Sequence, residues 1–261
     1  MYQLVQFDHV ERLLREAETF SGGGDGLVRN VGGFATAILK FRSISICEVL
    51  GYQIAAAVGI RAARTQGFWT PQSVDAVGPG CPGILAEPGR IGILVEYHDD
   101  WTDLGWDYAA MLDRTAVARA LALCAFDRTE WGSFGRSGGA VYFADLERLL
   151  PGIQPETLLG ASRKKQIEIL VATQAPYDEQ SSGMIEQVIV EADRLGLLNE
   201  VNRELEKLCS LEPQTYSEFL KLAGHPLDGL LSRFAASVFG RRLNAIAERI
   251  GRPTHKVPRW R

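Results

Sequence analysis

Hydrophobic and polar positions recur along the chain with two different periods. In roughly the first hundred residues, short apolar runs lie between Gly-rich and Pro-rich stretches, which is typical of strands joined by turns. Beyond Pro151, apolar positions recur at three- and four-residue spacing, which is typical of amphipathic helices. The pattern therefore predicts a β-rich N-terminal half followed by a helical C-terminal half.

Two β-prone runs on either side of Gly32-Gly33 predict a hairpin in the first half, since paired glycines suit a two-residue turn. The other elements expected there are helices over 8–18 and 46–58, loops around one short strand over 71–90, and a strand buried on both faces over 91–97. We place the boundary between the halves just after this last strand, which makes the units 1–98 and 99–261.

The second half is expected to be mostly helical. A helix over 115–126 leads into a polar loop over 127–139 and a short strand over 140–144. Beyond Pro151 the spacing predicts helices over 163–173, 183–195, 199–209, 215–223 and 227–249, and no strand. The expected fold class is therefore α+β, with its strands concentrated in the first half.

Composition excludes several classes of protein. With 46% hydrophobic and 23% charged residues among 261, the chain has an ordinary globular composition. Its longest uninterrupted apolar run, residues 120–126, is too short to cross a bilayer, so no membrane insertion is expected. Four cysteines without a CxxC pair argue against a disulfide framework or a zinc site and favour a reducing cytoplasm.

The charge is unevenly distributed. A net charge of −4 argues against a protein that coats nucleic acid. Residues 1–150 carry a net charge of −5 and residues 151–261 a net charge of +1. The last eleven residues hold four Lys/Arg and no acid. This basic tail is either a frayed, solvated end or a contact with an anionic substrate or partner.

Five features of the chain carry candidate chemistry. In order they are the Gly-rich SGGGDG at 21–26, Lys40 at the end of the hairpin, Glu48 on the next helix, Asp127-Arg128 in a loop, and Asp145 at a strand end. Phosphoryl transfer from ATP uses these residue types: glycines allow close backbone approach, a lysine held by a carboxylate neutralises phosphate oxygens, and aspartates address the acceptor hydroxyl and Mg²⁺.

Each feature alone has a plain structural alternative. The glycines suit a flexible turn, Lys40 could extend its amine to solvent, Glu48 could face water, and Asp145 could cap the following helix. Two other patterns also have a plain structural interpretation. The GxSxG match at 135–139 lacks the strand-to-helix context of a nucleophile elbow and predicts a turn. His98-Asp99-Asp100 lacks the second His/Asp cluster of a metal phosphohydrolase and predicts a polar segment after the strand. The order of the five features favours phosphoryl transfer.

In this order the sequence resembles the HipA-like kinases, within the wider class that includes the phosphatidylinositol kinases. The resemblance rests on SGGGDGLVRNVGGFATAILKFRSISICEVLGYQIAAAVGI, on ILVEY, on CAFDRTEWGSF and on VYFADLERL, and it covers residues 20–150. It implies a two-lobed kinase-like fold, with a small β-rich N-lobe over 1–98 and a larger all-helical C-lobe over 99–261, whose catalytic loop spans 127–145.

The resemblance also implies a role for each matching residue. Lys40 would contact the phosphates with Glu48 as its partner, Asp127 would address the acceptor hydroxyl, and Asp145 would bind Mg²⁺. Arg128 would stabilise the loop. The residues implied in nucleotide binding are Ser21, Gly22, Gly23, Gly24 and Gly26 over the phosphates, and the backbone of Glu96 and Tyr97 at adenine. The expected function is transfer of the γ-phosphate of ATP to a hydroxyl of a protein or small molecule.

Two positions depart from the family pattern. Thr129 stands where the family usually has a histidine, and Gly132 where it has an asparagine that binds a second metal ion. Glycine has no side chain to coordinate a metal. This leaves three alternatives open: a nucleotide-binding pseudokinase that acts as an adaptor or regulatory subunit, transfer of AMP in place of phosphate, and a helical module that binds no nucleotide.

Overall fold

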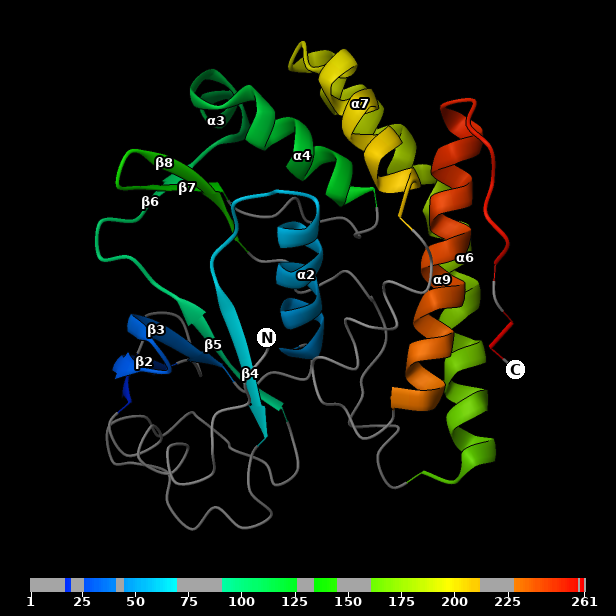
Figure 1. The fold of residues 1–261 in the computed structure, drawn as a ribbon, viewed down its shortest axis with the longest axis horizontal. Helices are drawn as coiled ribbons and strands as arrows, with labels where there is room; N and C mark the ends of the chain where they lie inside the picture. The colour runs from blue at the N-terminus through cyan, green and yellow to red at the C-terminus, as the bar shows by residue number, and fades with distance from the viewer. Residues whose placement is uncertain are drawn as a thin grey trace.

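The computed structural model of the chain (Figure 1) describes residues 17–19, 26–40, 45–69, 91–125, 134–144, 161–211, 228–257 and 259–260. These residues form a mixed α+β fold with two small antiparallel sheets. The larger sheet has the order β1-β2-β3-β5-β4 and contains β1 (Glu18–Thr19), β2 (Gly26–Val31), β3 (Phe34–Lys40), β4 (Thr65–Trp69) and β5 (Ile91–Glu96). The smaller sheet has the order β6-β7-β8 and contains β6 (Thr102–Leu104), β7 (Phe134–Ser137) and β8 (Ala140–Phe143). The helices are α2 (Ser45–Ala57), α3 (Trp106–Leu112), α4 (Arg114–Cys124), α6 (Arg163–Arg194), α7 (Leu198–Cys209) and α9 (Asp228–Arg249).

The strands β2 and β3 form the predicted hairpin. Val31 pairs with Phe34 across the turn, and Gly32 and Gly33 have φ values of 57° and 80°. A two-residue hairpin turn with both φ angles positive matches the twist of the strands, and glycine adopts it without strain. The prediction from the Gly-Gly pair is confirmed.

The strand β5 lies between β3 and β4, and its centre is withdrawn from water. Ile93 and Leu94 point to opposite faces of the sheet, and both are 0% exposed. The expected strand buried on both faces is therefore confirmed. Its partner β4 was not predicted, because TQGFW has no apolar alternation. It forms a strand by pairing with β5, from Thr65 with Val95 to Trp69 with Ile91.

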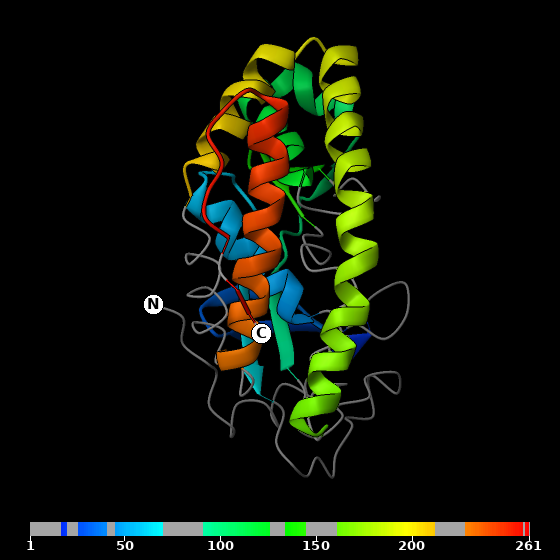
Figure 2. The same ribbon diagram turned by 90° about the vertical axis from the view of Figure 1, so that its right-hand side faces the viewer.

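The predicted helix 46–58 is α2, and it ends in a glycine as expected. The Ile60 N–H donates to the Ala55 carbonyl and the Gly59 N–H to the Ala56 carbonyl, while Gly59 has a φ of 75°. This pattern satisfies the last carbonyls of the helix and requires a left-handed residue at Gly59. Figures 1 and 2 show α2 between the larger sheet and the pair of helices α6 and α9.

The smaller sheet corrects two expectations. Residues 99–261 are not all helical, and the loop expected over 127–139 contains β7 from Phe134 to Ser137. The strand β6 and the helix α3 were not predicted either. Three- and four-residue strands are too short to show a period, so their pairing with neighbours creates them. The strand expected over 140–144 is confirmed as β8.

Backbone hydrogen bonds join the smaller sheet to the segment that follows α2. The Phe143 N–H donates to the Arg61 carbonyl at 2.9 Å, and the Ala63 N–H donates to the Phe143 carbonyl at 3.2 Å. One cluster of buried apolar side chains includes residues of α2, β5, β8 and the helices α4, α6, α7 and α9. The two expected units are thus connected through β8 and through a shared core.

The longest helix replaces two that were predicted. Helices were expected over 163–173 and 183–195, separated at Pro176 and at the Ser-Gly-containing segment after it, yet α6 runs without interruption from Arg163 to Arg194. Both of its ends pack into the same core, through Leu170 on one side and Val188 on the other, and this packing overrides the local signals. In Figure 2, α6 and α9 run alongside each other.

The helices expected over 199–209 and 227–249 are confirmed as α7 and α9, and the described residues beyond Pro151 contain no strand. The helix expected over 215–223 lies outside the described residues. The one expected over 8–18 also lies outside them up to residue 16, and its last residue, Glu18, belongs to β1.

The basic C-terminal segment packs against the helices. The Trp260 ring meets the Phe234 ring edge to face at 5.0 Å and is 5% exposed. Arg252 lies 2.7 Å from Glu206, and the Asn244 side chain exchanges two hydrogen bonds with the His255 backbone. The interpretation of a frayed tail is therefore wrong: burial of the penultimate tryptophan fixes this end of the chain.

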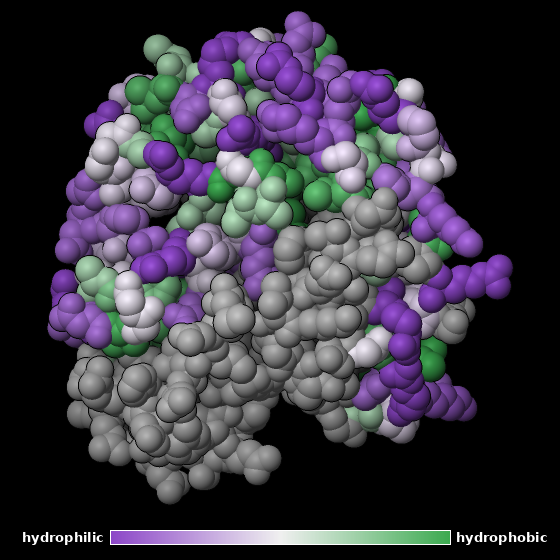
Figure 3. Space-filling model, in the orientation of Figure 1, coloured by the Kyte–Doolittle hydropathy of each residue, from purple (hydrophilic) through white to green (hydrophobic). Residues whose placement is uncertain are grey.

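The face of the molecule that Figure 3 shows is largely polar where its residues are described. In Figure 3, hydrophilic side chains cover much of the upper and right-hand parts of the face, with smaller hydrophobic patches between them. Among the described residues, no helix combines the length and the apolar character that crossing a bilayer requires. Cys124 and Cys209 are both buried and carry free thiols.

The contact between Trp101 and β7 yields the first prediction. A Cβ added at Gly135 would lie 1.9 Å from Cζ2 of Trp101, so Gly135→Ala must displace the indole and overpack this side of the smaller sheet. We expect it to lower the free energy of unfolding by about 2 kcal/mol in urea denaturation. Gly105→Ala is the matched control, since a Cβ there meets nothing within 4 Å; as Gly105 is the N-cap of α3, the variant should lower stability by less than about 1 kcal/mol. Equal stability of the two variants would contradict this account.

Candidate functional site

The structure brings Lys40 and Glu48 together. Lys40 is the last residue of β3 and Glu48 lies in the first turn of α2. Nζ of Lys40 donates to Oε1 of Glu48 at 2.9 Å, and the two side chains are 7% and 5% exposed. The alternatives of a lysine that extends to solvent and a glutamate that faces water are therefore wrong.

The surroundings of this pair explain its geometry. Lys40 is placed by the β3–β5 ladder, in which it pairs with Ile93. Glu48 benefits from the N-terminal end of α2, where the helix dipole favours a negative charge. A buried ion pair recovers its desolvation penalty only with good geometry, and loss of one partner leaves an uncompensated charge. The pair therefore binds the end of β3 to the start of α2.

The Gly-rich segment falls between two paired strands. Ser21, Gly22, Gly23 and Gly24 lie outside the described residues, whereas Gly26 is the first residue of β2. Gly26 pairs with Thr19 of β1 on one side and with Leu39 of β3 on the other. Residues 20–25 thus connect two strands of a hairpin whose second strand lies next to the strand that carries Lys40.

The backbone N–H groups of Glu96 and Tyr97 are engaged inside the protein. The Glu96 N–H donates to the Arg64 carbonyl at 2.8 Å and the Tyr97 N–H to the Thr36 carbonyl at 3.1 Å. The bond from Glu96 to Arg64 could not be anticipated from the sequence, because Arg64 directly precedes β4 and β4 was not predicted. A nucleotide base at this position would have to be recognised through other groups of residues 96–100.

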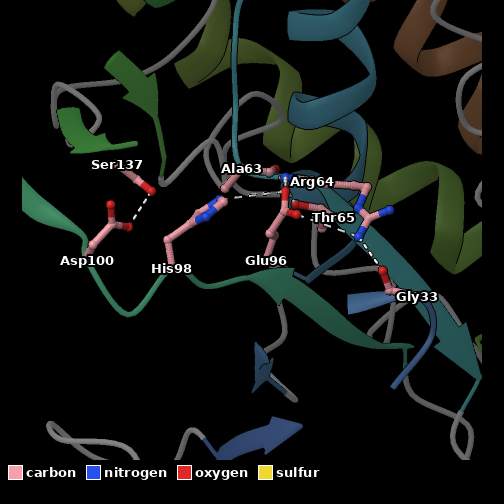
Figure 4. Close-up of polar contacts among 8 residues, drawn as sticks. All are labelled: Gly33, Ala63, Arg64, Thr65, Glu96, His98, Asp100 and Ser137. Atoms are coloured by element: carbon pink, nitrogen blue, oxygen red, sulfur yellow. Dashed lines mark hydrogen bonds and ion pairs between the residues drawn. The ribbon is translucent and has the colours of Figure 1, made fainter. Parts of the chain in front are cut away.

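Arg64 is a residue of this region that sequence reasoning missed. Its guanidinium donates to the Gly33 carbonyl at 2.7 Å, lies 3.6 Å from the Glu96 carboxylate and stacks 4.2 Å from the Phe34 ring centroid. Figure 4 shows Arg64 reaching from the start of β4 to the β2–β3 turn. It ties the hairpin turn to the end of β5. Nothing local in the sequence distinguishes it from other surface arginines.

The segment after β5 is fastened to the β7–β8 turn. Oγ of Ser137 donates to one carboxylate oxygen of Asp100 at 2.5 Å (Figure 4). The Gly138 N–H donates to the other carboxylate oxygen at 2.8 Å. The hydrogen bond from Ser137, and next the one from Gly138, lower the pKa of the Asp100 carboxyl. Gly138 and Gly139 have positive φ values and form the turn that the GxSxG match predicted, while the first three residues of the match belong to β7.

The two aspartates of the predicted catalytic loop lie outside the described residues, as do Arg128, Thr129 and Gly132. Their neighbours are described. The helix α4 ends at Cys124, shortly before Asp127, and Ala125 is fully buried. The strand β8 ends at Phe143, two residues before Asp145, and is held to Arg61 and Ala63 by hydrogen bonds. Both aspartates therefore follow residues with fixed positions.

The comparisons with known proteins do not identify the chain: no protein-family model matches it, and no curated protein is significantly similar to it. In the part of the chain that the structure describes, no group of three or more His, Cys, Asp or Glu side chains could hold a metal ion. The site is thus characterised by the Lys40–Glu48 pair and by the strands and helix around it.

Removing one partner of the buried pair should be more damaging than removing both. Glu48→Gln removes the carboxylate to which Lys40 donates at 2.9 Å, and we expect a loss of about 3 kcal/mol in the free energy of unfolding. In the double variant Lys40→Met/Glu48→Leu no charge is buried, so stability should return to within about 1 kcal/mol of the wild type. Urea denaturation measures the free energy of unfolding of the single and the double variant. Additive losses in the double variant would show that the two side chains are not coupled.

The Asp100 contacts predict a pH effect. Because the folded-state pKa is below the unfolded value, Asp100 stabilises the protein above the unfolded pKa, and this stabilisation is lost as pH falls through the folded pKa. Ser137→Ala removes the strongest hydrogen bond, so the pKa of Asp100 should rise toward its ordinary value, as followed by NMR titration of the carboxyl carbon. Ser210→Ala, whose hydroxyl donates to the Lys207 carbonyl instead, is the control. An unchanged Asp100 titration in Ser137→Ala would refute this origin of the shift.

Proposed function

We propose that this protein is an ATP- and Mg²⁺-dependent phosphotransferase with a two-lobed kinase-like arrangement, which transfers the γ-phosphate to a hydroxyl of a protein or small molecule. The observation that carries the proposal is the buried ion pair of Lys40 and Glu48, which joins a strand to the helix that follows it. The distance from Nζ of Lys40 to Oε1 of Glu48 is 2.9 Å. In protein kinases a lysine on the third strand is held by a glutamate on the next helix, and both must be in place for catalysis.

The order of the larger sheet supports the same function. The Gly-rich segment joins β1 to β2, Lys40 ends the third strand, and α2 connects β3 to β4. A phosphate-covering loop must lie beside the strand that carries the phosphate-binding lysine, and the pairing of β2 with β3 provides this neighbourhood. The strand β5 pairs with β3 on its other side and leads into the second sheet.

In the proposed reaction each residue has a separate task. Lys40 neutralises phosphate oxygens and Glu48 holds its ammonium in place. Asp127 orients the acceptor hydroxyl and receives its proton, while the oxygen forms a bond to the γ-phosphorus and the bond to the β-phosphate oxygen breaks, releasing ADP. Asp145 would hold Mg²⁺, which supplies charge neutralisation on the phosphates. One carboxylate plus phosphate oxygens is a ligand set that Mg²⁺ accepts, so the single aspartate fits.

A second function, that of a nucleotide-binding pseudokinase, is favoured by one residue. Gly132 provides no oxygen where the family pattern has a metal-binding asparagine. Such a protein would bind ATP through the same Lys40–Glu48 pair and act as an adaptor or regulatory subunit. Transfer of AMP is a variant of the first function with a different leaving group. A reducing cytoplasm remains the location that the cysteine pattern favours, and the acidic overall charge argues against a nucleic-acid partner.

Nucleotide binding and transfer are separable by experiment. ATP with Mg²⁺ at 100 times its Kd should raise the free energy of unfolding by about 2.7 kcal/mol. Asp145→Ala should abolish the dependence of this gain on Mg²⁺. Asp193→Ala, which changes an exposed acid on α6, should leave that dependence unchanged.

Transfer is tested with ATP that carries an isotopic label on one phosphate. Transfer of the labelled γ-phosphate to an acceptor identifies the kinase, transfer of the labelled α-phosphate identifies AMP transfer, and binding without transfer identifies the pseudokinase. No stabilisation by ATP under any condition would refute all three.

A further inference from the structure

The C-terminal end of α2 is held by an arginine of another helix. Nη1 of Arg119, on α4, donates to the Gly59 carbonyl at 2.5 Å. Nε of the same guanidinium lies 3.7 Å from the Glu204 carboxylate of α7. Glu204 is only 8% exposed and is also 2.7 Å from Nζ of Lys207. One side chain therefore links α2, α4 and α7.

A guanidinium group is favourable at the C-terminal end of α2. The C-terminal end of a helix carries partial negative charge, so a guanidinium there is attracted to it. Glu204 balances the charge and limits where the guanidinium can lie. Glycine is required at position 59 by its backbone, since a φ of 75° disfavours other residues, while a Cβ there would make only an ordinary contact with Nη1 of Arg119 at 3.5 Å. Arg119 is thus held by one hydrogen bond to Gly59 and by the charge of Glu204 at 3.7 Å.

The opposite end of α2 carries Glu48. A helix moves approximately as a rigid body, so a rotation that carried its first turn away from β3 would also displace its last turn and the Gly59 carbonyl. The segment just beyond is bonded to β8 through Arg61, Ala63 and Phe143. Outward movement of Glu48 therefore has to break contacts at the far end of the helix.

We propose that Arg119 is a positioning residue that holds α2 where Glu48 reaches Lys40, and so couples the α4–α7 helices to the phosphate-binding lysine. The proposal rests on the proposed function for its catalytic meaning. The coupling itself can be measured without any nucleotide.

Arg114 provides a matched comparison on the same helix. It also joins α4 to α7, with Nη2 2.8 Å from Oε1 of Glu200 and 2.7 Å from the Gly196 carbonyl, and neither contact involves α2. Loss of Arg114 therefore removes an α4–α7 contact of the same kind and leaves the end of α2 untouched. A purely structural role for Arg119 predicts the same consequences for both variants.

The experiment measures two local properties of the nucleotide-free protein. One is the rate at which acetic anhydride acetylates Lys40, followed by mass spectrometry, since the lysine is 6% exposed and reacts only when the pair opens. The other is amide hydrogen exchange in α2, compared with exchange in α9. In Arg119→Met we expect both the acetylation rate and the α2 exchange rate to rise about tenfold, with α9 unchanged. Arg114→Met should match the wild type in both.

A second pair of variants serves if Arg119→Met does not fold. Arg119→Lys keeps a cation for the Gly59 carbonyl but cannot also reach Glu204, and Glu204→Gln removes the counter-charge while keeping the arginine. Both variants should raise the acetylation rate of Lys40 and the exchange rate of α2, but by less than Arg119→Met does. Equal acetylation and α2 exchange in the Arg119 and Arg114 variants, or a parallel increase in α9, would overturn the proposal.

Activity then tests the catalytic meaning separately. With ATP and Mg²⁺, Arg119→Met should lower kcat about tenfold and change KM for ATP little, because Lys40 is displaced from the transition state more than the nucleotide is from its site. Failure of the wild type to bind ATP would refute the proposed function. The acetylation and exchange results would still decide whether Arg119 positions α2.

Discussion

A lysine and a glutamate that are both withdrawn from water hold β3 and α2 in one relative position, and the arrangement of the first half of the chain depends on them. Loss of either charge is costly, because the desolvation penalty of a buried ion is several kcal/mol and a close opposite charge offsets it. Nζ of Lys40 and Oε1 of Glu48 are 2.9 Å apart at the point where the central strands meet the helix. The β3–β5 ladder positions one partner and the first turn of α2 positions the other.

This pair is only one of several contacts that fix α2. Its last turn ends in a glycine whose carbonyl accepts from Arg119, and the residues beyond it pair with the end of β8. The polar segment after β5 is fastened separately to the β7–β8 turn through Asp100. These contacts connect the larger sheet, the smaller sheet and the helices around the region in which we propose that phosphate is transferred. In that proposal, rigidity serves catalysis by keeping the lysine oriented before the nucleotide binds.

The contact between Lys40 and Glu48 could be predicted from the order of residues, and other contacts of this region could not, for a physical reason in each case. Lys40 and Glu48 were predicted as partners because a strand-end lysine and a helix glutamate follow a Gly-rich segment. The engagement of the Glu96 N–H was not predictable, since it depends on β4, whose sequence TQGFW carries no strand pattern. Arg64 and Arg119 resemble any surface arginine in sequence. Their roles follow from carbonyl groups that are distant in the chain.

The sequence by itself determined the elements whose cause is local: the β2–β3 turn with its two glycines, the helix α2 with its terminal glycine, and the apolar strand β5. Backbone conformation and hydrophobic density within a short window are enough to specify these. Tertiary structure decided the burial of the ion pair, the strands β4, β6 and β7, the continuity of α6 and the packing of Trp260. These features depend on partners far away in sequence, because burial and interstrand hydrogen bonds are properties of two segments together and no window of one segment contains them.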